Sequence, residues 1–238
     1  MINSVYNYLK RIKFDKQETF QLLAVILIVG FVLGLDDGRA TSQLDVIWLK
    51  NFVASMLASA LIFFVFVIFV KIVSYWRGYY AKYVWNPLPL LFTILLSFLT
   101  FGKLIFFLPG GFDFRIVQHR RLGKFRHGPL LIEKAMISFF SIIFVLVIAM
   151  ASKSFADSSL LASNLLSFSL YFSLYAILPL PLKNPGLDIL TYSVHFYIFS
   201  LLFVFITATL LYFLEPVWAV LIGVIATFVA FNKLKDRL

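Results

Sequence analysis

Seven long runs of apolar residues occupy most of this 238-residue chain. A bilayer accepts hydrocarbon on every outward face, at about 20 apolar residues per crossing, whereas a soluble fold of this size has too little interior to bury them. Apolar residues make up 62% of the chain and charged residues 13%, against roughly 45–50% and roughly 25% in soluble domains. A water-soluble globule is therefore excluded. The runs are Phe20–Leu35, Phe52–Trp76, Pro87–Pro109, Leu130–Ala151, Leu160–Leu182, Ile189–Leu214 and Val217–Phe231.

The distribution of Lys and Arg predicts that six of the seven runs cross the membrane. Cytoplasmic loops collect Lys and Arg, and if 87–109 crossed, the most basic segment of the chain would face outward. If that run instead dips in and returns, the cytoplasmic side holds 1–19, 71–134, 183–188 and 232–238, with 18 of the 21 Lys and Arg residues. We therefore expect a protein of the cell membrane with both termini in the cytoplasm. The basic residues expected to set this orientation and contact lipid are Lys10, Arg11, Lys13, Arg115, Arg120, Arg121, Lys124 and Arg126.

The third run predicts a non-helical insert inside the helical bundle. Its prolines and glycines break helices. Short strands are expected at Leu104–Leu108 and Phe112–Val117, around a Pro-Gly-Gly turn, in a small membrane-associated β-like insert at about 103–119. Such backbone is tolerated at membrane depth only when protein shields it, which points to a functional region. The alternative is an ordinary kinked span followed by a basic outer loop.

The expected fold class is an all-α polytopic membrane protein with about six transmembrane helices. One transmembrane domain, 20–231, is flanked by a basic cytoplasmic or interfacial segment at 1–19 and a basic tail at 232–238. The formal charge of +10 is explained by membrane orientation. The expected partners are therefore membrane lipids and transmembrane helices of other proteins, and not nucleic acid.

The chain offers few groups for catalysis. It contains no HExxH or GxSxG motif and no cysteine. His119 and His127 lie among arginines that would repel a metal cation. His195 follows Asp188 by seven residues, which places both on one face of a continuous helix, and an intramembrane ionisable pair is a candidate functional site. The alternative is a histidine bonded to a neighbouring hydroxyl. Lys71 is expected to extend toward the interface without a function.

Four segments together resemble a known family. Phe66–Tyr83 is similar to a HELAHK-type helix followed by an aromatic, a glycine and an Ala-acid-Tyr stretch. Asn86-Pro87 through Pro109-Gly110 is similar to an NP-initiated segment that leads into a membrane-associated β region. Gly123–Pro129 resembles a GxxxxxGP segment, and Ile177–Asp188 resembles a helix-ending LPxxxLDG element. These motifs are those of the site-2 protease-like intramembrane zinc metalloproteases, and the resemblance covers about residues 52–200.

The resemblance implies the family's fold but not its chemistry. Phe66, Val67 and Val70 stand where the family has its first zinc histidine, its catalytic glutamate and its second zinc histidine. Apolar side chains neither bind zinc nor activate water. Asp188 keeps the third ligand's type, but one carboxylate is not a zinc site. The resemblance therefore implies a degenerate family member whose zinc site is lost, and no cofactor is predicted.

Three functions stay open at this point. A catalytically inactive homologue would bind transmembrane helices or partner proteins in the former substrate groove, and the strand edge around 104–117 would add an extended peptide. A small transporter or channel would use Asp188, His195 and Lys103 along a polar path. An active hydrolase would hold a metal on Asp188, His195 and His127. The first is favoured, and its expected partner-binding residues are Phe112, Phe114, Asp188 and His195.

Overall fold

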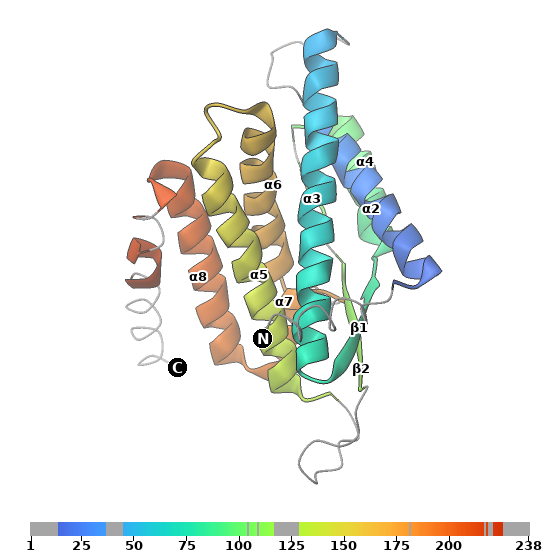
Figure 1. Ribbon diagram of the computed structural model, residues 1–238, viewed down its shortest axis with the longest axis vertical. Helices are drawn as coiled ribbons and strands as arrows, with labels where there is room; N and C mark the ends of the chain where they lie inside the picture. The colour runs from blue at the N-terminus through green and yellow to red at the C-terminus, as the bar shows by residue number, and fades with distance from the viewer. Residues whose placement is uncertain are drawn as a thin grey trace, which may run out of the picture.

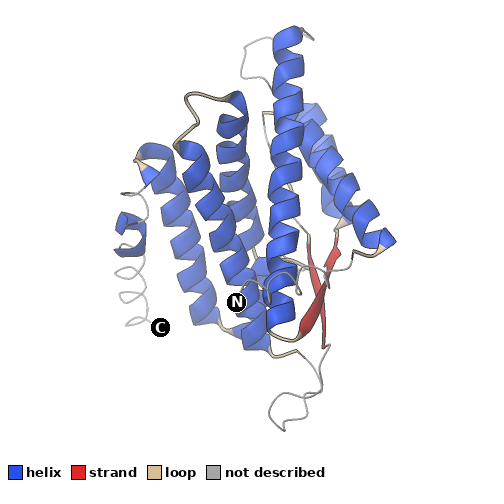
Figure 2. Ribbon diagram, viewed as in Figure 1, coloured by secondary structure: helices blue, strands red, loops and turns tan. Residues whose placement is uncertain are grey.

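A bundle of long apolar helices forms most of the molecule, with a two-stranded sheet at one end (Figures 1 and 2). The computed structural model describes residues 14–36, 45–103, 105–108, 110–116, 129–180, 182–216, 218 and 221–225. The elements are α2 (Lys16–Leu35), α3 (Val46–Trp76), β1 (Tyr79–Val84), α4 (Pro87–Thr100), β2 (Gly111–Ile116), α5 (Leu131–Lys153), α6 (Leu160–Ile177), α7 (Pro185–Tyr192) and α8 (Val194–Phe213).

Five of the described helices, α2, α3, α5, α6 and α8, are long and apolar enough to cross a membrane. This agrees with the expected class, a mostly helical polytopic membrane protein. The last expected span, Val217–Phe231, lies largely outside the described residues. A crossing number of six therefore stays a prediction.

The third apolar run leaves the sheet and returns to it. Val84 at the end of β1 pairs with Gly111 at the start of β2, so both ends of the run lie together. In between, α4 packs along α2 and ends at Phe101 and Gly102, which both have positive φ. Gly102 lies at the far end of α2, where an added Cβ would stand 2.8 Å from the Asp36 nitrogen. The segment therefore leaves the sheet as a helix and returns to it through residues 105–108, which form neither helix nor strand. That the run does not cross the membrane stays a prediction.

One of the two strand predictions is wrong. The described residues of Leu104–Leu108, 105–108, form no strand, whereas Phe112–Val117 corresponds to β2. The antiparallel partner of β2 is β1, whose side chains alternate between buried and partly exposed. Residues 105–108 instead contact the long helices. The Ile105 carbonyl accepts a hydrogen bond from the Tyr175 hydroxyl, and Phe107 packs among rings of α3 and α6. Tertiary packing thus replaces the local hairpin.

Close packing joins the first two long helices. An added Cβ on Gly30 would lie 2.5 Å from the sulfur of Met56 and 2.6 Å from Oγ of Ser59, and one on Gly34 would lie 2.8 Å from the ring of Phe52. Glycines four residues apart let two membrane helices approach closely. This contact holds α2 along the side of α3 and aligns the start of α2 with the sheet (Figure 1).

The sheet end of the bundle is defined here by β1, β2 and the start of α2. Several segments that the loop charges place on one side of the membrane meet there. Three ion pairs join them: Lys71 to Glu18 at 2.9 Å, Lys82 to Asp15 at 2.8 Å, and Lys183 to Asp113 at 3.3 Å. The common location of these segments agrees with the charge count, but Lys103, which that count placed on the same side, follows Gly102 at the far end of α2. That this end faces the cytoplasm stays a prediction.

Candidate functional site

The three positions that correspond to the zinc and catalytic residues of the resembling family lie in the core. Phe66, Val67 and Val70 of α3 are at most 1% exposed. The ring of Phe66 lies 4.8 Å from the ring of Phe172 in α6 and 5.6 Å from that of Phe112 in β2. These side chains pack against protein and not against lipid. The space beside this part of α3 is filled by aromatic rings.

This packing carries no group that ligates a metal. Aromatic and aliphatic side chains supply neither lone pairs for zinc nor a base for water. Within the described ranges, no three His, Cys, Asp or Glu side chains are placed to hold a metal ion. His127, one of the ligands considered for a hydrolase, lies outside those ranges, as do His119, Arg120, Arg121, Lys124 and Arg126, and also Lys10, Arg11 and Lys13.

Asp188 lies in the first turn of α7, a short helix that packs mainly against α5 and α8. Asn184 caps this helix by accepting a hydrogen bond from the Gly186 nitrogen. Ser138 of α5 donates to Oδ2 of Asp188 at 3.1 Å. Burial raises the pKa of this carboxyl to about 6, although the Ser138 hydrogen bond, Lys134 and Lys183 oppose the shift. Asp188 is therefore a carboxylate held by α5.

The expected polar path is not assembled. Ser193 has an extended backbone between α7 and α8 and caps α8 through the Phe196 nitrogen, so Asp188 and His195 do not share a continuous helix. The prediction that the two lie two turns apart on one face is wrong, because the capping serine ends one helix and begins the next. His195 is exposed. Lys103 is also exposed and follows Gly102, at the opposite end of the bundle from the sheet.

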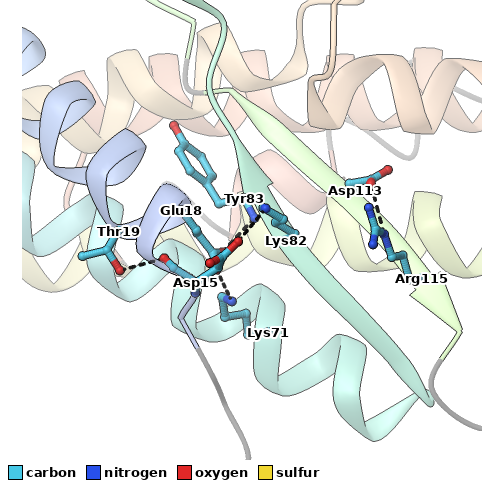
Figure 3. A network of polar contacts seen from close by, with 8 residues as sticks. All are labelled: Asp15, Glu18, Thr19, Lys71, Lys82, Tyr83, Asp113 and Arg115. Carbon is cyan, nitrogen blue, oxygen red and sulfur yellow. Dashed lines mark hydrogen bonds and ion pairs between the residues drawn. The ribbon is translucent and has the colours of Figure 1, made fainter.

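A buried ion pair at the sheet end was not predicted. Glu18 and Lys71 have side chains 0% and 4% exposed, so the expectation that Lys71 reaches the interface is wrong. One carboxylate oxygen of Glu18 accepts from Lys71, and the other accepts from the main-chain nitrogen of Tyr83 at 2.8 Å (Figure 3). The Asp15-x-x-Glu18 spacing, typical of a capping box, was the available sequence signal. This cluster fastens the start of α2 to α3 and β1.

The contact between Glu18 and Tyr83 determines which edge of the sheet is free. Because the Tyr83 N–H points to Glu18, it points away from β2, and the Tyr83–Phe112 pair exchanges no ladder hydrogen bonds. By the same alternation, the N–H and C=O groups of Phe112, Phe114 and Ile116 point away from β1. Among the described residues, no main-chain hydrogen bond joins this outer edge to another segment. Glu18 thus pairs one outward N–H of β1, that of Tyr83, whereas no main-chain hydrogen bond between described segments reaches the outer edge of β2.

The side chains of β2 divide between the two faces of the sheet. Phe112 and Phe114 are 8% and 7% exposed, so their rings belong to the core and do not offer a docking surface. Arg115 is 72% exposed and forms an ion pair with Asp113. The main-chain groups of β2 that point away from β1 belong to Phe112, Phe114 and Ile116.

Comparisons with known proteins add no relative: no family model, no curated protein and no solved structure matches this chain.

Proposed function

We propose that this protein is an integral membrane protein that binds an extended segment of a membrane partner along the outer edge of β2 and does not cleave it. The observation that carries the proposal is the row of main-chain groups at Phe112, Phe114 and Ile116, which point away from β1 and have no main-chain hydrogen bond to another segment among the described residues. Main-chain groups exposed at membrane depth cost several kcal/mol each unless they are paired. A partner strand would pair them by adding a third strand to the sheet.

The likeness of the sequence to site-2 proteases supports the same reading. In this proposal the protein derives from that family, and Phe66, Val67 and Val70 fill the former zinc cavity with hydrocarbon. The aromatic packing of Phe66 with Phe112 links the filled cavity directly to β2. A binding function therefore needs no change of fold, only the loss of the ligands.

Two proline variants test the edge, because proline removes one N–H and the direction of that N–H differs between neighbouring residues. Ile116→Pro removes an outward N–H, and Arg115→Pro removes one that the alternation directs toward Tyr80 of β1. Both are made in a chain with a photocrosslinking amino acid at Asp113, which lies on the same strand. The amount of crosslinked partner is measured in membranes, and the thermal stability of each variant is measured in detergent.

We expect Ile116→Pro to reduce the crosslinked adduct about tenfold with little change in stability. Arg115→Pro should lower the free energy of unfolding by about 1–3 kcal/mol, since it leaves a strand carbonyl unpaired. An undiminished adduct in Ile116→Pro would show that the partner does not use this edge. An adduct that falls in proportion to stability in both variants would equally count against the proposal.

A further inference from the structure

A polar cavity of about 360 Å³ lies at the end of the bundle opposite the sheet. Asn164 of α6 donates to Oδ1 of Asn51 and to Oγ of Ser55, both in α3, at 3.1 Å. Asn51 donates in turn to the Asp36 carbonyl at 2.9 Å. Ser163, Ser167 and Tyr171 of α6 add hydroxyl groups to the lining. The cavity is therefore lined by a connected set of amide and hydroxyl groups together with an acidic residue, Asp36, whose carboxyl group disfavours an anionic ligand.

An apolar groove adjoins this cavity. It measures about 280 Å³ and lies between α6 and α8, where Leu170, Leu174 and Phe213 contribute to its walls. Ser167 and Tyr171 line both spaces, so the exposed face of α6 is a floor common to the cavity and the groove. The helix α6 contacts both α3 and α8, and Figure 1 shows α5 drawn between α6 and α8.

The surface formed by the cavity and the groove is polar at one end and apolar at the other, as a lipid molecule is. The 18 residues of α6 rise about 27 Å at 1.5 Å each, close to the roughly 30 Å of a hydrocarbon core, so an α6 that crosses the membrane has its first turn near the interface. The amide cluster lies about one turn below Leu160, where α6 begins. The apolar groove begins at Leu166 and continues to Leu174, at hydrocarbon depth.

We propose that the cavity and groove together bind one lipid molecule with an uncharged headgroup that carries hydroxyl groups, such as a glycolipid. Its hydroxyls would exchange hydrogen bonds with Asn164, Ser163 and Asn51, and an acyl chain would lie in the groove over Ser167 and Tyr171. No Lys, Arg or His is among the described residues that line either space, so a phosphate group finds no cation there.

The test uses purified full-length protein in detergent with two lipids of equal acyl chains, glucosyl diacylglycerol and phosphatidylglycerol. Native mass spectrometry counts the lipids retained. Ser167→Trp places a bulky ring on the floor that the cavity and the groove share. The matched control is Ser158→Trp, because Ser158 is an exposed turn residue at the same end of the bundle and lines neither space. Ser163→Leu narrows the polar side and serves as the second blocking variant. None of these residues touches the edge of β2.

We expect one retained glucosyl diacylglycerol per chain in the unchanged protein and in Ser158→Trp. Retention should fall at least fivefold in Ser167→Trp and in Ser163→Leu, and phosphatidylglycerol should be retained at least fivefold less than the glycolipid. Equal retention of the two lipids would overturn the headgroup assignment. Glycolipid retention that neither blocking variant reduces, or no retained glycolipid in the unchanged protein, would overturn the site.

Discussion

At the scale of single residues, Glu18 and Lys71 are the side chains on which the sheet end depends most. Glu18 accepts from Lys71 and from Tyr83 while fully buried, so it joins three elements through one carboxylate. Removing one member of a buried ion pair leaves an uncompensated charge and costs about 3–5 kcal/mol, although replacing both members by apolar groups is often nearly neutral.

We therefore predict that Lys71→Met lowers the free energy of unfolding by about 3–5 kcal/mol. Glu18→Gln removes the charge but keeps an amide oxygen for the Tyr83 nitrogen. The double variant should lose less than the sum of the single losses, by 1 kcal/mol or more. Thermal and denaturant unfolding in detergent measure the cycle. Strictly additive losses would show that the two residues stabilise the fold independently.

Asp188 predicts a pH dependence of stability. Its pKa is raised from 3.8 to about 6, so the folded state holds the proton more tightly than the unfolded state does. Stability from this group is therefore fully present below about pH 4 and is lost as pH rises to about 6. At about 1.4 kcal/mol per pH unit, the whole effect is at most about 3 kcal/mol.

Asp188→Asn should consequently be more stable than the unchanged protein at pH 7 and about equally stable at pH 4. Asparagine keeps an oxygen that accepts from Ser138 but carries no charge to bury. Unfolding measured at intervals from pH 4 to pH 7 distinguishes the two proteins, and Asp157→Asn, in the turn before α6, controls for loss of one carboxylate. A variant whose stability keeps the original pH profile would contradict the assignment.

At the scale of elements, the contact between α2 and α3 depends on the absence of side chains at Gly30 and Gly34. Bilayer lipid is as apolar as leucine, so helices in a membrane gain by close packing more than by burial. The Ser59 hydroxyl, which donates to the Ile26 carbonyl at 3.1 Å, shows how closely the two helices approach.

A graded pair of variants tests this packing. Gly30→Ala should destabilise by about 1 kcal/mol and Gly30→Leu by about 3 kcal/mol or more, because the larger side chain must displace Met56 and Ser59. Ala151→Leu, at an exposed position of α5, should have little effect. Unfolding free energies in detergent measure the three. Equal effects of Gly30→Leu and Ala151→Leu would show that α2 and α3 separate without cost.

At the scale of the whole molecule, the two ends of the bundle differ in chemistry. The sheet end holds buried and exposed ion pairs and the outer edge of β2, whereas the opposite end holds amides, hydroxyls and the acidic Asp36 around a cavity. The long helices connect these ends through aromatic rings, including Phe63, Phe66 and Phe172. The two proposed binding sites therefore lie at opposite ends of one rigid core and are tested by independent variants.

Much of the helix content could be predicted from the sequence, because each apolar run inside a bilayer must pair its own main-chain groups and therefore forms a helix. Runs of apolar residues with few charges predict helices wherever a membrane is the solvent, and each of the five long helices lies on an expected run. The bounds agree within two residues at both ends only for α5, whereas α3 begins six residues early, α6 ends five residues early and α8 begins five residues late. The first, α2, begins four residues before Phe20, because Asp15 and Glu18 form a capping box that charge counting treated as part of a tail.

The pairing of β2 and the partners of the buried charges were decided by tertiary structure alone. The strand partner of β2 is separated from it by a complete helix, and Lys71 lies 53 positions from Glu18, so no local pattern joins either pair. Serine at 193 was equally able to lie inside a helix or to cap one.

The sequence by itself determined that the chain is a membrane protein, that one apolar run is broken by prolines and glycines, and that residues 66, 67 and 70 are apolar. Only the tertiary structure decided that those three residues fill the core, that Glu18 pairs with the Tyr83 nitrogen, and that no main-chain hydrogen bond between described segments reaches the outer edge of β2. The physical reason is that hydrophobicity acts through composition along the chain, whereas hydrogen bonds and ion pairs act only between groups that folding has already brought within about 3 Å of each other.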